Sequence, residues 1–497
     1  MTASEPDNAQ LMADDNRGWT SQLVFTTLFL AMVLETLALG ASMVSIGLPS
    51  ILAEFPTDQG GWLLTTYYLA GAVAAPLLGK LADIYGKRKI LLLTLVASCT
   101  GTLICALSVS FPMLIAGRTL QGLIMATISL SYSLIRDVFP PKPAAIAASI
   151  TVTGMGAFSI VAPSLIGWLL DTWGFRGMFW FDLAWMGSLT LAIFLVTPES
   201  PLRRKATPDL VGAGLLALGV VPLLVWVSMS LTWGWLSPMG IGLVLLGVVS
   251  LTLFFRHTRR VADPIVNLSL FRRKQLQFVT ITGATGYALG ATAGTILPMM
   301  AMAPKGVDGY GLGLSTTQYS WVGTPNALLS VIAGVVLGTL VSRGRHPQIF
   351  MASSMFLFPF GLVLLAFRND TLFDVLLAAL ILGAALGFAN GSVPNLVIRA
   401  TPADDQGSTS GTIQLCQTGF GAITPVLMFA LLSRYATISP EGGVHYSEDG
   451  FQACLLIAAA FTAGVFVLAR TKLWDRSSTP ATAAPTMQPA DQPRIDR

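Results

Sequence analysis

Two ionisable side chains stand inside long apolar stretches of this sequence. Glu35 is the only charged residue of FLAMVLETLALGASMVSIGL, residues 29–48, and Arg118 is the only one of LIAGRTLQGLIMA, residues 114–126. If both stretches cross a bilayer, a rise of about 1.5 Å per helical residue puts Glu35 about 20 Å from one face and Arg118 about 10 Å from the other. In a hydrocarbon core about 30 Å thick, the two charges then lie at a similar depth.

Opposite charges at one depth on neighbouring helices predict a site that handles protons. Charged groups far from water are costly in a membrane, and they are typical of ion and proton pathways. A carboxylate between an apolar surrounding and an arginine can take up and release a proton, as a proton-coupled carrier requires. Two alternatives remain: a structural ion pair between Glu35 and Arg118, and an Arg118 side chain that extends to the nearer interface.

The composition predicts the elements that carry these residues. Mean hydropathy is +0.69, and only 11% of the residues are charged, against about 25% in soluble domains. Apolar segments recur along the chain, each near the length of about 20 residues that a spanning helix needs. We therefore expect an all-α integral membrane protein with fourteen transmembrane helices, at 22–48, 61–79, 90–109, 112–134, 146–169, 178–197, 209–229, 237–256, 276–302, 318–341, 348–367, 373–396, 409–433 and 450–471.

The distribution of basic residues predicts the orientation, since Lys and Arg collect in cytoplasmic loops. With both termini cytoplasmic, only Arg176, Lys305, Arg368 and Arg434 of the 29 Lys and Arg residues fall outside the cell, and Arg118 lies within a span. The chain is expected in the cell membrane. It divides into a cytoplasmic tail (1–20), a six-helix bundle (21–200), a two-helix insert with basic linkers (201–275), a second six-helix bundle (276–474) and a disordered cytoplasmic tail (475–497).

Residues that could support other activities are sparse. The four cysteines lie in apolar runs, and His257, His346 and His445 lie in loops, so no metal site is expected. A phosphate-binding glycine loop is missing as well, which argues against ATP as the direct energy source. We expect no cofactor, no nucleic-acid partner and no enzymatic activity, and we disfavour a channel because no repeated pore ring is visible.

The short loop GKLADIYGKRK, residues 79–89, carries the strongest motif. It matches every position of G-x-L-A-D-x-x-G-[RK]-[RK]-[RK], and the chain therefore resembles the major facilitator superfamily, whose fold has two six-helix halves. The resemblance implies a cytoplasmic latch between the halves. Asp83 would meet QGSTSG (406–411), and Arg88 would join Asp137. The latch residues implied in this way are Gly79, Asp83, Gly86, Lys87, Arg88 and Asp137.

Two further stretches resemble motifs of this superfamily. Arg118, Gln121 and Gly122 match its R-x-x-Q-G pattern, which implies that Arg118 assists proton transfer. WGFRGMFWFD resembles W-R-W-x-F-x-x-N with Asp182 in place of Asn. Asp182 is therefore either a second acidic site for proton coupling or a solvated aspartate at the outer mouth of its span.

The fifth span and the first span bear on the subfamily. Gly154, Gly156, Pro163 and Gly167 resemble the antiporter motif of the fourteen-helix drug:proton antiporter family, which implies export. That family carries an Asp in its first span, and alignment on SIGLPSI puts this position at Gly40, five residues after Glu35. Either Glu35 has taken over the role of this Asp or the chain couples differently.

The function expected from these features is proton-coupled export by alternating access, in which two halves rock around a central site. The substrate would be a hydrophobic or cationic small molecule, carried by a monomer. The predicted cavity is lined by Glu35, Tyr67, Gln121, Tyr287 and Asn390, although each polar group could instead form an interhelical hydrogen bond. A lipid or siderophore exporter on the same fold is the alternative.

Overall fold

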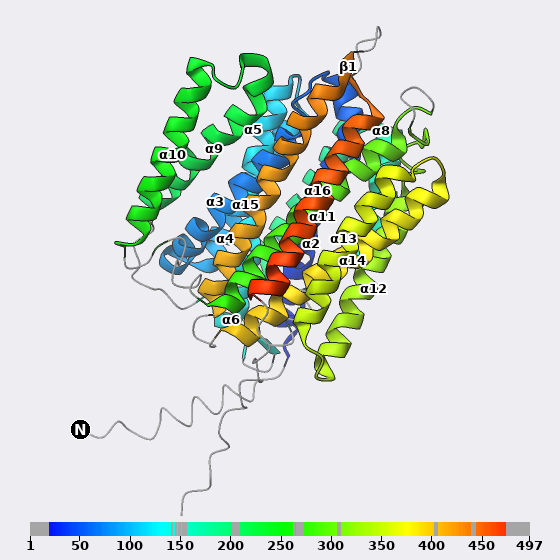
Figure 1. The fold of residues 1–497 in the computed structure, drawn as a ribbon. Coiled ribbons are helices and arrows are strands. Elements are labelled where there is room, and N and C mark those ends of the chain that lie inside the picture. The colour runs from blue at the N-terminus through cyan, green and yellow to red at the C-terminus, as the bar shows by residue number, and fades with distance from the viewer. Residues whose placement is uncertain are drawn as a thin grey trace, which may run out of the picture.

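A computed structural model gives the fold of residues 19–140, 143–144, 147, 151, 157–200, 209–261, 264, 273–305, 310–401, 406–438 and 444–473. Within these ranges the chain is almost entirely helical (Figure 1). The helices are α2 (Ser21–Glu54), α3 (Trp62–Tyr85), α4 (Lys87–Ala106), α5 (Phe111–Gln121), η1 (Gly122–Ala126), α6 (Thr127–Val138), α8 (Ala157–Val196), α9 (Leu210–Trp233), α10 (Pro238–Thr258), α11 (Lys274–Met302), α12 (Ser320–Ser342), α13 (Pro347–Phe367), α14 (Leu372–Ala400), α15 (Gln406–Leu432), η4 (Ser433–Tyr435), α16 (Glu448–Leu468) and η5 (Ala469–Leu473).

One small sheet interrupts the helices. Strands β1 (Ala436–Ile438) and β2 (Val444–Tyr446) pair antiparallel, with Ala436 opposite Tyr446. They lie between α15 and α16, and Tyr310 donates a hydrogen bond of 2.7 Å from its hydroxyl to the Tyr446 carbonyl. The hairpin therefore covers one end of the bundle (Figure 1).

The prediction of an all-helical membrane protein is confirmed. Eleven helices among the described residues are long and apolar enough to cross a membrane, and twelve if α3, bent by 42° between Ala75 and Leu77, is one span. Two further predicted spans agree with helical segments that this count does not give separately. One is the second part of α8, which breaks at Gly174 with φ of 66°, and the other is α11, which coincides with the expected span 276–302.

The helices fall into two halves and an insert. The first half comprises α2 to α8, the insert α9 and α10, and the second half α11 to α16. α9 packs against α3 and α15, and α10 packs against α9 along one flank of the bundle (Figure 1). Trp62 of α3 donates a hydrogen bond of 2.9 Å to the Ser228 hydroxyl of α9. Much of α10 is exposed and apolar, as expected of a face that meets lipid.

The two ends of the bundle differ in charge and in how the halves meet. We call the end with Lys80, Lys87, Arg88 and Arg343 the basic end, and the end with Glu54, Arg176 and the β hairpin the opposite end. Most hydrogen bonds recorded between described residues of the two halves lie towards the opposite end. The Thr65 hydroxyl donates to the Ala422 carbonyl at 2.7 Å, and the Asp171 carboxylate accepts from the Thr317 amide at 2.9 Å.

Small residues bring the halves into close contact at this end. A Cβ atom at Gly61 would lie 2.7 Å from the Pro425 carbonyl oxygen, and one at Gly167 would lie 2.5 Å from the Thr316 carbonyl oxygen. Both positions therefore require glycine while the end is closed. We call these contacts the opposite-end seal, formed by Gly61, Thr65, Gly167 and Asp171 in the first half and by Thr316, Thr317, Ala422 and Pro425 in the second.

Candidate functional site: a buried charge network in the first half

Arg118 lies at the centre of the site and is fully buried. Its Nε donates to the Leu63 carbonyl of α3 at 3.1 Å, and its Nη1 donates to the Gly40 carbonyl of α2 at 3.1 Å. Nη1 also donates to the Oε1 atom of Gln121. The guanidinium lies 4.1 Å from the centre of the Tyr67 ring, in a cation–π contact. Arg118 therefore holds α2, α3 and α5 together, and its side chain turns inward rather than to an interface.

Asp182 belongs to the same network. Its side chain is 0% exposed, and its Oδ2 atom accepts from Gln121 Nε2 at 2.8 Å and from the Thr102 hydroxyl at 3.2 Å. The solvated aspartate considered from the sequence is therefore wrong, because α8 turns Asp182 towards α4 and α5 inside the first half. Gln121 bridges Asp182 and Arg118 through the two ends of one amide group.

Glu35 is buried, with 6% of its surface exposed, but it forms no ion pair with Arg118 among the described residues. Its Oε1 atom accepts from the Phe158 amide of α8 at 3.5 Å, and its Oε2 atom has no partner within the described part of the chain. The structural ion pair between Glu35 and Arg118, considered from the sequence as an alternative, is thus wrong. Arg118 meets α2 at the Gly40 carbonyl, more than one helical turn beyond Glu35, and Glu35 faces α8 instead.

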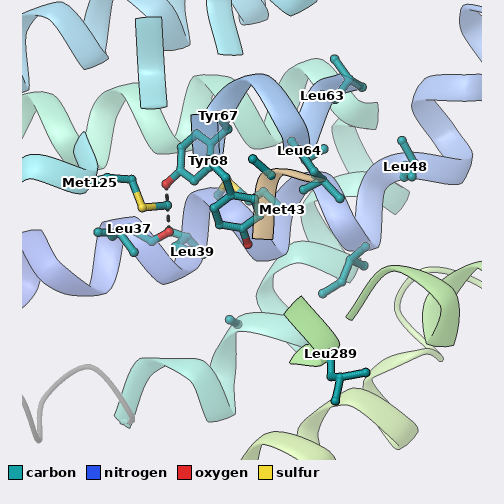
Figure 2. Packing of buried hydrophobic residues seen from close by; sticks show 14 of the residues in the cluster. Leu37, Leu39, Met43, Leu48, Leu63, Leu64, Tyr67, Tyr68, Met125 and Leu289 are labelled. Atoms are coloured by element: carbon teal, nitrogen blue, oxygen red, sulfur yellow. Dashed lines mark hydrogen bonds between the residues drawn. The ribbon is translucent and has the colours of Figure 1, made fainter. Parts of the chain in front are cut away.

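The residues expected to line one cavity are only partly brought together. The Tyr67 hydroxyl donates to the Leu37 carbonyl at 3.0 Å, as the dashed line in Figure 2 shows. Tyr67 contacts Tyr68 edge to face, with ring centres 5.5 Å apart, and Tyr68 contacts Tyr287 of the second half at 5.7 Å. Tyr67, Gln121 and Tyr287 therefore belong to one connected group, whereas Asn390 is exposed and outside this group.

The loop of residues 79–89 at the basic end forms a second charge cluster, with a different pairing from the expected one. Lys87, not Arg88, binds Asp137, and the same ammonium lies 3.7 Å from Asp83. Arg88 instead donates to the Phe194 carbonyl and stacks on the Phe194 ring. The expected pairing of Arg88 with Asp137 is therefore wrong, since Arg88 is turned outward towards α8.

Two further parts of the latch prediction concern the segment expected to face Asp83 and the two glycines of the loop. The stretch expected to receive Asp83, residues 406–411, lies largely outside the described side chains. Gly86 ends α3 and starts α4 with φ of 116°, a conformation that favours glycine, so the motif requires Gly86 for the turn. Gly79 has open space around its Cβ position.

Sequence reasoning missed Glu199, which follows the sixth span. Its carboxylate accepts from the Arg88 amide at 3.0 Å and from the Lys89 amide at 3.1 Å. These are unpaired amides of the first turn of α4, where a negative charge is favourable. An acidic residue directly after a span, beside the basic loop, was the available signal.

The described residues of the antiporter motif, Pro163 and Gly167, lie at the interface between the two halves. Gly167 belongs to the opposite-end seal, and the Cβ position of Gly323 on α12 would lie 2.9 Å from Pro163. Gly154 and Gly156 lie outside the described residues. Pro163 and Gly167 thus allow α8 to approach α12 closely.

Outside the spans, the turn between α12 and α13 also contains a glycine with positive φ. Gly344 has φ of 91° and closes the turn. His346 accepts from the Gln348 amide at the start of α13 at 3.4 Å. Burial, and then the nearby Arg399, lowers the pKa of His346, which favours the neutral ring that can accept this bond.

Two packed helical halves with buried charges and glycine-rich contacts between them are the architecture of a membrane transporter. A sequence profile of the Major Facilitator Superfamily matches residues 28–425 and 312–494. The chain belongs to this superfamily of transporters, whose substrates are small molecules.

Individual relatives have low sequence identity to this chain. An uncharacterised MFS-type transporter of Mycobacterium tuberculosis is 28% identical over 414 residues, covering 81% of this chain and 58% of that protein. This chain therefore spans little more than half the length of that relative. The multidrug resistance protein Stp of M. tuberculosis is 27% identical over 439 residues, covering 86% of this chain and 78% of Stp.

Among solved structures, a bacterial homolog of the human lysosomal transporter Spinster, in an inward-facing and unoccupied conformation, has a similar fold. Its TM-score is 0.65 at 16% identity, and the match covers 93% of this chain and 100% of that chain.

Proposed function

We propose that this chain is a proton-coupled exporter of the fourteen-helix drug:proton antiporter type, which moves hydrophobic or cationic small molecules out of the cell. One observation carries the proposal: Glu35, Arg118 and Asp182 are all buried within the spans of the first half. Ionisable groups at that depth are costly to keep and are typical of proton relays in transporters.

The cycle would proceed by alternating access. With the opposite-end seal closed, substrate would enter from the basic end, which we place in the cytoplasm because Lys and Arg collect in cytoplasmic loops. The halves then rock, the seal opens, and protons from outside displace the substrate. Release of these protons inside resets the carrier. Glu35 is a candidate for the exchanging group because one of its two carboxylate oxygens lacks a partner among the described residues.

Export and the substrate class are supported by the name of Stp, a multidrug resistance protein. A carboxylate in apolar surroundings favours the binding of cationic substrates. Lipid or siderophore export on the same fold is the second candidate, but α9 lies across the seam between α3 and α15, where a lipid would otherwise enter sideways. We propose that the protein works as a monomer with both termini in the cytoplasm.

The test is ethidium transport into proteoliposomes with an imposed pH gradient. We expect the gradient to drive ethidium accumulation by the native chain, and Glu35→Gln to reduce it to the level of empty liposomes. Glu54→Gln is the matched control, since it makes the same change at the exposed end of the same helix, where Glu54 pairs with Arg176. Accumulation that ignores both the gradient and Glu35→Gln would rule out the proposed coupling through Glu35.

A further inference from the structure

We propose that Asp182 is the counter-charge of Arg118, and that proton binding at Asp182, transmitted by Gln121, changes how Arg118 holds α2 and α3. This inference rests on the proposed proton-coupled function. It identifies a second proton-binding group, in addition to Glu35, and a positioning residue between it and the arginine.

The first observation is that the Asp182 carboxylate is incompletely hydrogen-bonded. Its Oδ2 atom accepts two hydrogen bonds from neutral groups, Gln121 and Thr102, while its buried Oδ1 atom has no partner among the described residues. Two neutral donors do not cancel a buried negative charge. A proton on the carboxyl group would remove that charge, weaken both bonds to Oδ2 and allow the Gln121 amide to turn.

The second observation is the orientation of the Gln121 amide. An ionised carboxylate can only accept hydrogen bonds, so Asp182 requires the amide nitrogen, and the amide oxygen is left for Arg118. Arg118 Nη2 has no partner within the described residues, so the guanidinium is not fully satisfied either. The charge of Asp182 therefore determines both the field at Arg118 and the acceptor offered to it.

Arg118 passes this change to two helices. It binds the Gly40 carbonyl of α2 and the Leu63 carbonyl of α3, and α3 packs against α15 of the second half. The titratable or charged groups that face Asp182 are Cys99 and Cys105 on α4, Tyr67 on α3 and Arg118 on α5. Arg118 is the sole cation in this set, so protonation of Asp182 leaves it without a counter-charge there.

Gly40 offers an independent test of the geometry. A Cβ atom at Gly40 would lie 3.2 Å from the Tyr67 hydroxyl and 3.8 Å from Gln121 Nε2. A carboxylate placed at position 40 would thus reach the same amide nitrogen from α2 once the Tyr67 hydroxyl is removed. The variant Gly40→Asp/Tyr67→Phe/Asp182→Asn moves the acid and keeps an aromatic ring against Arg118.

The experiment measures ethidium accumulation in proteoliposomes with and without a pH gradient, together with downhill ethidium exchange. We expect Asp182→Asn to lose the stimulation by the gradient and to retain downhill exchange. Asp182→Glu should retain stimulation with a shifted pH profile, and the triple variant should regain it. The double variant Tyr67→Phe/Asp182→Asn is the reference for the triple variant, since it keeps the ring against Arg118 but carries no acid at position 40 or 182, and it should lack the stimulation.

Each outcome separates the two proposals. If the native chain ignores the gradient, the proposed function fails. If the native chain responds and Asp182→Asn responds equally, or the folded triple variant does not recover, this inference is overturned while the proposed function stands. If Asp182→Asn does not fold, infrared difference spectra decide. A protonated-carboxyl band that changes on ethidium binding and shifts in Asp182→Glu supports Asp182, and the lack of such a shift rejects it.

Discussion

At the scale of single residues, Arg118 illustrates how a cation is kept inside a membrane bundle. Its donors bind the carbonyls of Gly40 and Leu63 and the amide oxygen of Gln121, while the Tyr67 ring covers its face. Carbonyl oxygens and a ring face each supply part of the negative potential that a single carboxylate would otherwise provide. The opposing charge of Asp182 can therefore lie one residue further away, behind Gln121.

The Lys87–Asp137 pair at the basic end makes a stability prediction. Both side chains are almost fully buried, and removing one partner leaves the other charge uncompensated. We expect Lys87→Met to destabilise the protein by about 1–3 kcal/mol, less than the value for a deeply buried pair because this pair lies near the bundle end. Thermal unfolding in detergent measures the change.

Lys89→Met is the matched control, because Lys89 is exposed on the same helix turn and, among the described residues, bonds through its backbone amide alone. We expect Lys89→Met to unfold at the same temperature as the native chain. Equal stability of Lys87→Met and Lys89→Met would mean that the buried pair contributes nothing.

The same residues show how far the sequence predicts the site. The depth of Glu35 and Arg118 follows from counting residues, since each adds about 1.5 Å along a helix. The direction of a side chain around the axis does not follow, because neighbouring residues differ by about 100° and helix rotation depends on packing. Counting residues therefore could not predict that Glu35 faces α8 rather than Arg118, or that Lys87 rather than Arg88 pairs with Asp137.

At the scale of elements, α8 and α12 provide a prediction about the opposite-end seal. A side chain at Gly167 would collide with the backbone at Thr316, whereas Gly187 on the same helix has open space at its Cβ position. We expect Gly167→Val to hold the opposite end open and Gly187→Val to have little effect. The rate of maleimide labelling at Thr65→Cys, a buried seal position, reports the difference.

Faster labelling at Thr65→Cys in the Gly167→Val background than in the Gly187→Val background would support the seal. Identical rates in the two backgrounds would mean that Gly167 does not control access from this end.

The helices themselves were predictable because a spanning segment must satisfy its backbone internally and be apolar over its whole length. The break at Gly174 agrees with the boundary expected between the fifth and sixth spans. The β1–β2 hairpin was not foreseen. Its three-residue strands depend on contacts of Tyr446 with Phe429, Phe451 and Tyr310, which lie far apart in the sequence or across a turn.

At the scale of the whole molecule, the two halves should be separable at the opposite end if they rock. The Ser164 and Thr324 hydroxyl oxygens, one from each half, lie 3.2 Å apart. We expect the double variant Ser164→Cys/Thr324→Cys to form a disulfide on oxidation and to stop ethidium transport. Reduction should restore transport to the native level.

The two single variants, Ser164→Cys and Thr324→Cys, are the controls and should transport ethidium under both conditions. Full transport by the oxidised, cross-linked double variant would show that this end does not open during the cycle.

The two-helix insert also constrains the surroundings of the molecule. α9 accepts hydrogen bonds from Trp62 of α3 and from Gln59 just before α3, and it meets α15 in apolar packing that includes Leu415. If the halves rock, the insert travels with the first half and slides along α15. Bulk lipid must then be displaced on the α10 flank at every turnover, so transport by this protein should slow as the bilayer becomes more viscous.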